Sequence, residues 1–256
     1  MSYYFAMLLI YTLSAVKKYP EKFETLLSGL NGISGASLYV VKCKEISAVV
    51  SDIKKADLIA SRSIVLEYAE VIDNLAKLFT LLPMRFGSVM ESIDAIADML
   101  ERNYCEIQLN LLKVEDKLEF GLKVFCDSEK LKEELLTKTK DGIKSPANPA
   151  HEIENSVFRE YVNKKLKEHR LEELVLVYVD SVIAEINSYL SFLNADSKIK
   201  KLPSASVMID AVLLLPKGRK NDLIQAAGDL QNQYPGLSFV MTGPWPPYSF
   251  VEIAIK

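Results

Sequence analysis

The chain has 256 residues and a mass of 28.8 kDa, which is enough for two hydrophobic cores. Its 49% hydrophobic and 25% charged residues are typical of a packed globular protein and exclude a largely disordered chain. The 31 basic and 34 acidic residues give a formal net charge of −3. Because no basic excess is available to neutralise phosphates, the composition argues against nucleic acid as the main partner.

The longest uncharged segment, residues 2–16, is shorter than the roughly 20 apolar residues that cross a bilayer as a helix. Lys17 and Lys18 follow this segment, whereas basic residues precede the apolar run of a signal peptide. We therefore expect a buried strand here and no membrane span.

Three widely spaced cysteines without a C-x-x-C pair predict neither a disulfide framework nor a zinc site, and they fit a reducing cytosol.

The first quarter of the chain has the features of an α+β domain. Residues 3–11 form an aromatic and aliphatic run that predicts a strand buried on both faces. Residues 21–30 are expected to form a short helix that ends among glycines. Residues 37–41 and 46–50 are rich in β-branched residues and predict a hairpin.

Two helices are expected next. From Ser61 to Leu82, apolar residues recur every three or four positions, which predicts a helix that Pro83 stops. Ser88 and Glu91 have the spacing of a capping box, so a second helix is expected to begin at Ser88. Its apolar stripe would consist of Val89, Ile93, Ile96 and Leu100.

The middle of the chain is expected to hold a strand pair and then helices. Hydrophobic and polar residues alternate over 107–111 and 118–124, which predicts two antiparallel strands. Residues 130–138 predict a short polar helix, followed by a loop over 141–149. Residues 151–194 predict helix. Within them, the β-branched residues 174–179 are also compatible with a strand, although we expect helix there.

The last sixty residues predict a strand over 207–213, a helix over 223–234, and strands over 237–242 and 248–255. Together with the preceding strand pair, this order favours a ferredoxin-like sandwich with an altered order of elements. We therefore expect an α+β protein of two domains. The first would span residues 1–104, and the second, residues 105–256, would have the modified ferredoxin-like fold.

The sequence contains no recognisable constellation for catalysis or cofactor binding. His151 and His169 lie among charged residues on an expected helix, where a solvated position is the simpler interpretation. The glycines at 29, 32 and 35 follow a helix rather than a strand, so they lack the context of a dinucleotide-binding loop. We therefore expect no catalytic, cofactor-binding or metal-binding residues, and no enzyme.

One segment, residues 243–250, has an unusual composition, because it holds the only tryptophan, three of the ten prolines and two further aromatic residues. Prolines restrict the backbone, which lowers the entropic cost of presenting Trp245 to a partner. Exposed aromatic residues on stiff backbone are typical of binding hot spots. The alternative is that Trp245 folds back over the sheet and is buried.

This segment, read as Thr242-Gly-Pro-Trp-Pro-Pro-Tyr-Ser-Phe-Val251, resembles the C-terminal signature of the GvpF/GvpL family of gas vesicle proteins. Residues 82–87, Leu-Pro-Met-Arg-Phe-Gly, resemble that family's Leu-Pro-x-Arg-Phe-Gly element. The opening apolar strand and residues 211–216 add to the likeness, whereas residues 130–194 carry no matching signature. The short length, without an acidic tail or insertions, is more similar to a cyanobacterial GvpF than to haloarchaeal members.

The resemblance implies a non-enzymatic, minor structural or accessory protein needed for gas vesicle formation, without a cofactor and located at gas vesicles within the cytoplasm. Its implied partners are the major shell protein GvpA and other Gvp accessory proteins. The candidate interaction residues are those of the two motifs: Pro83, Arg85, Phe86, Gly87, Gly243, Pro244, Trp245, Pro246, Pro247, Tyr248 and Phe250. For Arg85, we expect an ion pair with a carboxylate across the domain junction rather than a surface position.

A rival class remains open, because ferredoxin-like sheets host many ligands and a fold does not fix a function. In that alternative, the protein is a small-molecule-binding regulatory module.

Overall fold

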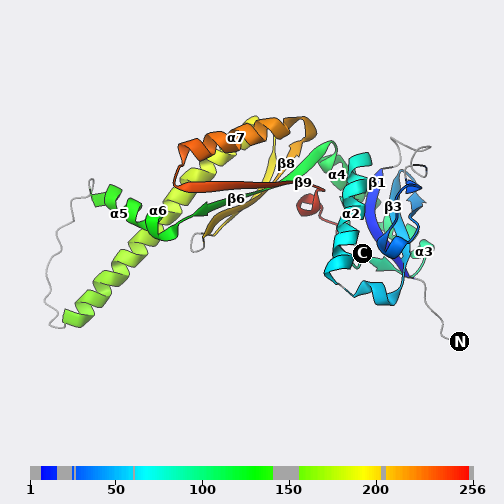
Figure 1. Cartoon of the computed structure of the whole chain (residues 1–256), viewed down its shortest axis with the longest axis horizontal. Helices are drawn as coiled ribbons and strands as arrows, with labels where there is room; N and C mark the ends of the chain where they lie inside the picture. Colours follow the sequence, from blue (N-terminus) through cyan, green and yellow to red (C-terminus); the bar gives the residue numbers. More distant parts are fainter. Residues whose placement is uncertain are drawn as a thin grey trace. The chain divides into compact units, whose positions relative to one another are not determined.

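The computed structural model describes residues 7–15, 25, 27–59, 61–140, 156–202 and 206–253 (Figure 1). The chain divides into two compact units, one made of residues 1–119 and 244–256 and the other of residues 120–243. Each unit contains a sheet and helices, which confirms the α+β fold class. This division differs from the expected boundary after residue 104, because the next helix packs in the first unit and the end of the chain returns to it.

The first unit is built on an antiparallel sheet with the order β2-β3-β1-β4, and β5 also pairs with β1. Its strands are β1 (Met7–Ala15), β2 (Tyr39–Cys43), β3 (Ile46–Ile53), β4 (Leu81–Pro83) and β5 (Val89–Met90). β1 is buried along nearly its whole length, as its apolar sequence predicts. The hairpin of β2 and β3 is confirmed, with Cys43 opposite Ile46. The expected helix over 21–30 and the start of the first strand lie largely outside the described residues.

The helices α2 (Arg62–Leu78), α3 (Ile93–Arg102) and α4 (Tyr104–Val114) pack in this unit. Short 3-10 turns occur at Ile33–Gly35 and Lys55–Leu58. The predicted helix is confirmed as α2, and the Ser61 side chain caps its start by accepting a hydrogen bond from the Ile64 amide. Tyr68, Val71, Ile72 and Leu75 of α2 are buried in the core. α2 ends at Leu78, earlier than predicted, because residues 81–83 pair with β1 instead of continuing the helix.

The prediction that the next helix begins at Ser88 is wrong. Residues 89 and 90 form β5 and pair with Leu9 and Leu8 of β1, so the chain is extended where the helix was expected. The helix begins at Ile93, and the side chain of Ser92 caps it by accepting a hydrogen bond from the Ala95 amide. Val89 therefore belongs to the sheet, and Ile93 is exposed.

The predicted strand over 107–111 is also wrong, because these residues lie in α4. Ile107 and Leu111 are buried and four residues apart, a spacing that satisfies a helical stripe as well as an alternating strand. Leu109, between them, is 67% exposed, which rules out the alternating pattern. Asn110 and Val114 are buried as well, so the buried residues recur with the period of a helix.

The second unit holds an antiparallel sheet with the order β7-β8-β6-β9. Its elements are β6 (Lys117–Cys126), α5 (Ser128–Lys140), α6 (Ser156–Phe192), β7 (Asp196–Lys201), β8 (Val207–Pro216), α7 (Lys220–Gln233) and β9 (Leu237–Trp245), with a 3-10 turn at Lys217–Arg219. The predicted strands and helices at β6, α5, β8, α7 and β9 are confirmed. In chain order, the elements run strand, two helices, strand, strand, helix, strand. The ferredoxin-like description of this unit stays a prediction.

Helix α6 includes residues 174–179, so the helical alternative is confirmed there. Val175, Val179, Val182, Ile186 and Leu190 form its buried stripe at helical spacing. Residues 169–192 are long and apolar enough to cross a membrane by length and composition. A single such helix is weak evidence for a membrane span, since core helices pass the same test.

The expected final strand over 248–255 is not formed in the described residues. A 3-10 turn covers Tyr248–Phe250, and residues 251–253 have no regular secondary structure. Two consecutive prolines precede this turn and supply no backbone N–H, which disfavours a sheet ladder at this point.

Candidate interaction surface

The first motif, residues 82–87, closes the edge of the sheet in the first unit. Pro83 lies opposite Thr12 of β1, and the Met84 amide donates a hydrogen bond to the Tyr11 carbonyl at 2.9 Å. β4 is an outer strand of this sheet, and an edge is where a strand tolerates proline. Pro83 is buried and therefore acts as part of the fold rather than as accessible surface.

Tyr68 of α2 fixes this motif against β1. Its hydroxyl lies 3.0 Å from the Ile10 carbonyl of β1 and 2.9 Å from the Met84 carbonyl just after β4, so its one proton is shared between the two carbonyls. Phe86 meets the Tyr68 ring edge-on, with centroids 5.4 Å apart, and Tyr11 stacks on it at 5.2 Å. The ring contact with Tyr68 therefore holds the partly buried Phe86 in an aromatic cluster.

The end of the motif is a turn. The Ser88 amide donates a hydrogen bond to the Arg85 carbonyl, and Gly87 has a φ of 87°, where an L side chain would be strained. The Arg85 side chain is exposed, and within the described part of the chain it forms no ion pair. The expected pairing of Arg85 across the domain junction stays a prediction.

The second motif, residues 243–250, divides into a buried and an accessible part. Pro246, Pro247 and Phe250 are buried, with Phe250 only 2% exposed. Trp245, the last residue of β9, is 48% exposed, and Tyr248 is 41% exposed. Gly243 and Pro244 are exposed, and Gly243 has a φ of 109°, again a conformation that favours glycine. Trp245 is therefore not the buried lid of the alternative interpretation.

A buried carboxylate holds this segment to the first unit. Glu119 is 5% exposed, and its two oxygens accept hydrogen bonds from the Ser249 amide at 2.8 Å and the Ser249 hydroxyl at 2.7 Å. Hydrogen bonds to a charged acceptor are stronger than bonds between neutral groups. Glu119 therefore fixes the turn that carries Tyr248 and Phe250.

Asn110 binds the backbone of Glu252, three residues after Ser249. The Asn110 side chain of α4 accepts a hydrogen bond from the Glu252 amide and donates one to the Glu252 carbonyl, both at 3.1 Å. Asn110 also donates to the Glu106 carbonyl within its own helix. The Lys113 ammonium lies 5.8 Å from the centre of the Phe250 ring, in cation–π range. The segment is thus tied to α4 and to β6 at several points.

Tyr68 and Tyr248 both have a raised hydroxyl pKa. Burial is the main cause that raises the pKa of the Tyr68 hydroxyl, and the neighbouring Tyr248 and Tyr11 add to the effect. Burial likewise raises the pKa of Tyr248, with Asp73 and Glu119 as further causes. Both tyrosines are therefore neutral at physiological pH. Of the eleven residues singled out from the sequence, four are buried, Phe86 is partly buried and the other six are exposed.

Sequence reasoning did not identify Asn110 or Glu119. Glu119 alternates with apolar residues in the predicted strand, the pattern of a solvated side chain, and Asn110 has the same pattern in the strand that proved to be a helix. Their partners lie 130 and 142 residues away along the chain. Patterns among neighbouring residues do not predict hydrogen bonds between residues so far apart in the sequence.

The described residues hold no constellation for catalysis. Within them, no three His, Cys, Asp or Glu side chains are grouped as metal ligands. His169 is exposed and forms a helix-surface pair with Glu173 at 3.4 Å, while His151 lies outside the described residues. The exposed Cys105 and the half-buried Cys43 and Cys126 are free cysteines.

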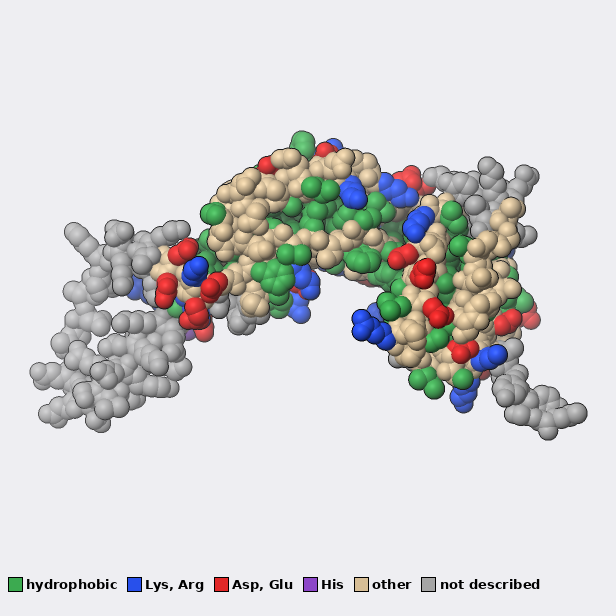
Figure 2. Space-filling view, viewed as in Figure 1, with side chains coloured by type: hydrophobic (Ala, Val, Ile, Leu, Met, Phe, Trp, Pro, Cys, Tyr) green, Lys and Arg blue, Asp and Glu red, His purple; other side chains and the backbone are tan. Residues whose placement is uncertain are grey.

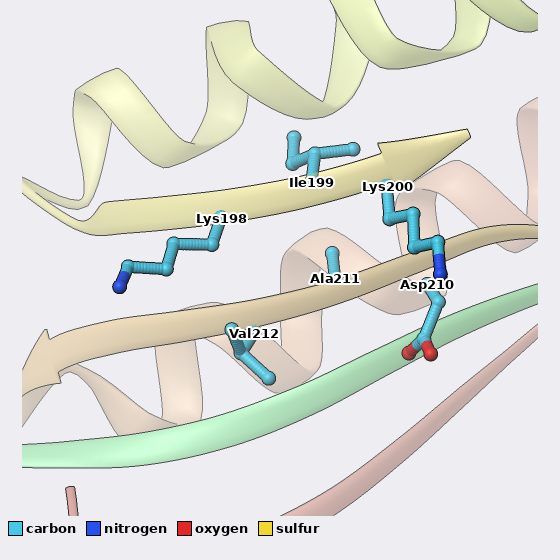
Figure 3. A pocket seen from close by; sticks show the side chains of 6 residues that line it. All are labelled: Lys198, Ile199, Lys200, Asp210, Ala211 and Val212. Atoms are coloured by element: carbon cyan, nitrogen blue, oxygen red, sulfur yellow. The ribbon is translucent and has the colours of Figure 1, made fainter. Parts of the chain in front are cut away.

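A shallow pocket lies over β7 and β8 in the second unit (Figure 3). Lys198, Lys200, Asp210 and Val212 point to one side of the two strands, whereas Ile199 and Ala211 point to the side of the helices. Asp210 lies 4.0 Å from the ammonium of Lys123, a long and solvent-exposed pair. These are ordinary surface charges, so the pocket gives no specific support to a small-molecule site.

The sequence model of the family described as "Gas vesicle synthesis protein GvpL/GvpF" matches residues 9–252. Curated relatives carry both names. The chain is 24% identical over 237 residues to gas vesicle protein F1 of Halobacterium salinarum, covering 91% of this chain and 90% of the relative. It is 21% identical over 192 residues to gas vesicle protein L of a Streptomyces species, covering 72% of this chain and 67% of the relative.

Two solved structures share the fold. The crystal structure of GvpF from Anabaena sp. PCC7120 matches with a TM-score of 0.73 and 19% identity, covering 97% of both chains. That of GvpF from Microcystis aeruginosa matches with a TM-score of 0.72 and 16% identity, covering 97% of this chain and all of the other. The family match spans both units and both motifs, so the chain belongs to the gas vesicle GvpL/GvpF family and has a role in gas vesicle formation.

Proposed function

We propose that this protein is a non-enzymatic accessory protein of gas vesicle assembly, which acts by contact with the major shell protein GvpA and with other Gvp proteins. The observation that carries the proposal is the pair of aromatic side chains beside a buried Pro-Pro step. Trp245 is 48% and Tyr248 is 41% exposed, while Pro246 and Pro247 between them are buried. Two accessible aromatic side chains are thus held on an anchored backbone.

This arrangement lowers the cost of binding. An aromatic side chain on a mobile loop loses backbone entropy when it binds, but this backbone is fixed by Glu119, Asn110 and the two prolines. Tryptophan and tyrosine are also the residues most enriched in binding hot spots. The segment is therefore suited to recognise an apolar surface of another protein.

The assembly role has a physical rationale. Apolar shell subunits that form an extended wall would expose strand edges and hydrophobic faces before they assemble, and such surfaces aggregate unless they are covered. A folded α+β protein with accessible aromatic residues can cover such a surface transiently or nucleate its growth. In this proposal the protein acts at gas vesicles within the cytoplasm.

A pull-down of GvpA by the purified full-length protein tests the proposal. We expect the wild type to retain GvpA and Trp245→Ala to retain it at least about fivefold more weakly, in the range of a hot-spot residue. The matched control is Phe192→Ala, which removes another exposed aromatic side chain, 77% accessible, from the second unit. Circular dichroism confirms that each variant is folded.

Two results would contradict the proposal in different ways. Equal retention of GvpA by the wild type and Trp245→Ala would move the contact surface away from the aromatic pair. No retention by any of the proteins would reject the GvpA contact and favour the regulatory alternative. A saturable rise in melting temperature on adding a nucleotide or an amino acid would then support that alternative.

A further inference from the structure

Three aromatic side chains form a half-buried cluster in the second unit: Tyr178 of α6, Tyr234 directly after α7 and Phe239 of β9. The Tyr234 ring contacts both of the others, edge-on to Tyr178 and tilted to Phe239, and the ring centroids are 6.4 Å apart in each pair. All three side chains remain partly accessible to solvent. We call these three residues the aromatic cluster, and it belongs to the surface of the unit rather than to its core.

The turn between α7 and β9 fixes two of the three rings. The Tyr234 amide donates a hydrogen bond to the Leu230 carbonyl, and the Tyr234 carbonyl accepts one from the Leu237 amide, both at 3.0 Å. The Gln231 side chain donates a hydrogen bond to the Leu237 carbonyl at 2.7 Å and accepts one from the Phe239 amide at 3.1 Å. The backbone of the cluster is therefore ordered before any ligand binds, which lowers the cost of binding.

The surroundings of the aromatic cluster are negatively charged. Burial raises the pKa of Tyr234, and the charge of Glu185 on α6 adds to the effect. Burial also raises the pKa of Tyr178, followed by Tyr234 and by Glu134 of α5. Glu185 is half-buried, and it has no ion-pair partner in the part of the chain that the structure describes. Figure 2 shows acidic side chains over α5 and α6 and hydrophobic side chains along α7 and β9.

Ring faces next to carboxylates attract cations, because the face of an aromatic ring carries partial negative charge. Arginine and lysine suit such a site, since their apolar stems pack on rings while the charged group meets the carboxylate. The cations of the described residues that lie over rings are Lys44, Lys113 and Arg219, and each lies over a ring outside the aromatic cluster. A metal ion is a poor occupant, because no three ligating side chains are grouped among the described residues.

We propose that the aromatic cluster binds an arginine or lysine side chain of a partner protein, with the Tyr234 ring as its main contact and Glu185 as the opposite charge. The proposal is independent of the proposed function, because Trp245 and Tyr248 belong to the first unit and the aromatic cluster to the second. A single accessible cation–π contact is weak by itself. The cluster therefore supplies selectivity for a basic side chain within a larger interface.

Two tripeptides that differ only in charge test the proposal. Acetyl-Gly-Arg-Gly-amide carries a guanidinium group, and acetyl-Gly-citrulline-Gly-amide has a neutral urea of nearly the same shape. Each peptide is titrated into isotopically labelled full-length protein, and NMR follows the backbone amides of Gln231 and Phe239. We expect the arginine peptide to shift these amides saturably and to bind at least about tenfold more tightly than the citrulline peptide. Equal affinities, or no saturable shift at these amides, would overturn the proposal.

Substitutions within the aromatic cluster locate the contact. Tyr234→Leu keeps an apolar side chain without a ring, and we expect it to weaken binding of the arginine peptide at least about fivefold. Tyr234→Phe keeps the ring, so a change below about twofold is expected. Glu185→Gln removes only the charge and should weaken binding about threefold. The matched control is Glu172→Gln, at an exposed glutamate on the same helix, which should leave the affinity unchanged.

The amide spectrum of each variant also shows whether it is folded. Wild-type affinity in both Tyr234→Leu and Glu185→Gln would overturn the proposal, because neither the ring nor the charge would then take part. The titration contains no Gvp protein, so its failure would leave the GvpA contact standing. Conversely, a failed GvpA pull-down would leave the peptide result unaffected.

Discussion

Replacing Phe250 by alanine is expected to lower the free energy of unfolding by about 3 to 5 kcal/mol, the range for truncating a buried aromatic side chain. Phe250 is 2% exposed, and the ammonium of Lys113 lies over its ring. The substitution would leave a cavity where the end of the chain packs on the first unit. The measurement is urea-induced unfolding followed by circular dichroism.

The control for this prediction is Trp245→Ala, which removes an aromatic side chain five residues away that is 48% exposed. We expect it to lower the free energy of unfolding by about 1 kcal/mol or less, because a half-exposed side chain loses little packing. Equal destabilisation by the two substitutions would contradict the division of the motif into an anchor and an accessible part.

Replacing Glu119 by alanine is expected to lower the free energy of unfolding by about 3 to 6 kcal/mol, since it removes the acceptor of two hydrogen bonds, each about 1.5 to 3 kcal/mol when the acceptor is charged. Ser249→Ala removes only the hydroxyl donor and is expected to cost about 1 to 2 kcal/mol. The double variant measures the coupling between the two side chains by thermal or urea unfolding.

A double-mutant cycle is the decisive form of this experiment, because it isolates the pair from the effect of each truncation alone. We expect the two substitutions together to cost less than the sum of their separate effects by about 1 to 2 kcal/mol. Glu91→Ala, at an exposed glutamate, is the control and should change stability by less than about 0.5 kcal/mol. Strict additivity of Glu119→Ala and Ser249→Ala would show that the bond between the Glu119 carboxylate and the Ser249 hydroxyl adds no stability.

Much of the fold follows from local patterns in the sequence. The hairpin of β2 and β3, the helical stripe of α2 and the alternation in β6 each carry a clear period, and each is confirmed. Errors arose where one pattern satisfies two periods. Ile107 and Leu111 fit both a strand and a helix, and burial of Asn110 and Val114 decides for the helix. Ser88 was predicted as a helix cap because the capping-box pattern considers only neighbouring residues. It does not take into account that residues 89 and 90 pair with β1.

The candidate surface was predictable only in part. The motif at 243–250 was found from its composition, but which of its side chains are buried depends on contacts with α4 and β6 far away in the sequence. Glu119 and Asn110 were missed for the same reason. The motif at 82–87 is mainly a structural turn, as the contacts of Tyr68 and the φ of Gly87 show.

The central claim is that this protein contributes to gas vesicle formation as an accessory protein. The most direct measurement is the number of gas vesicles, counted by electron microscopy, in host cells that lack the gene for this chain. The account predicts that gas vesicles fail to form without the chain and that the wild-type gene restores them. Gas vesicles in normal number and shape without the chain would contradict it.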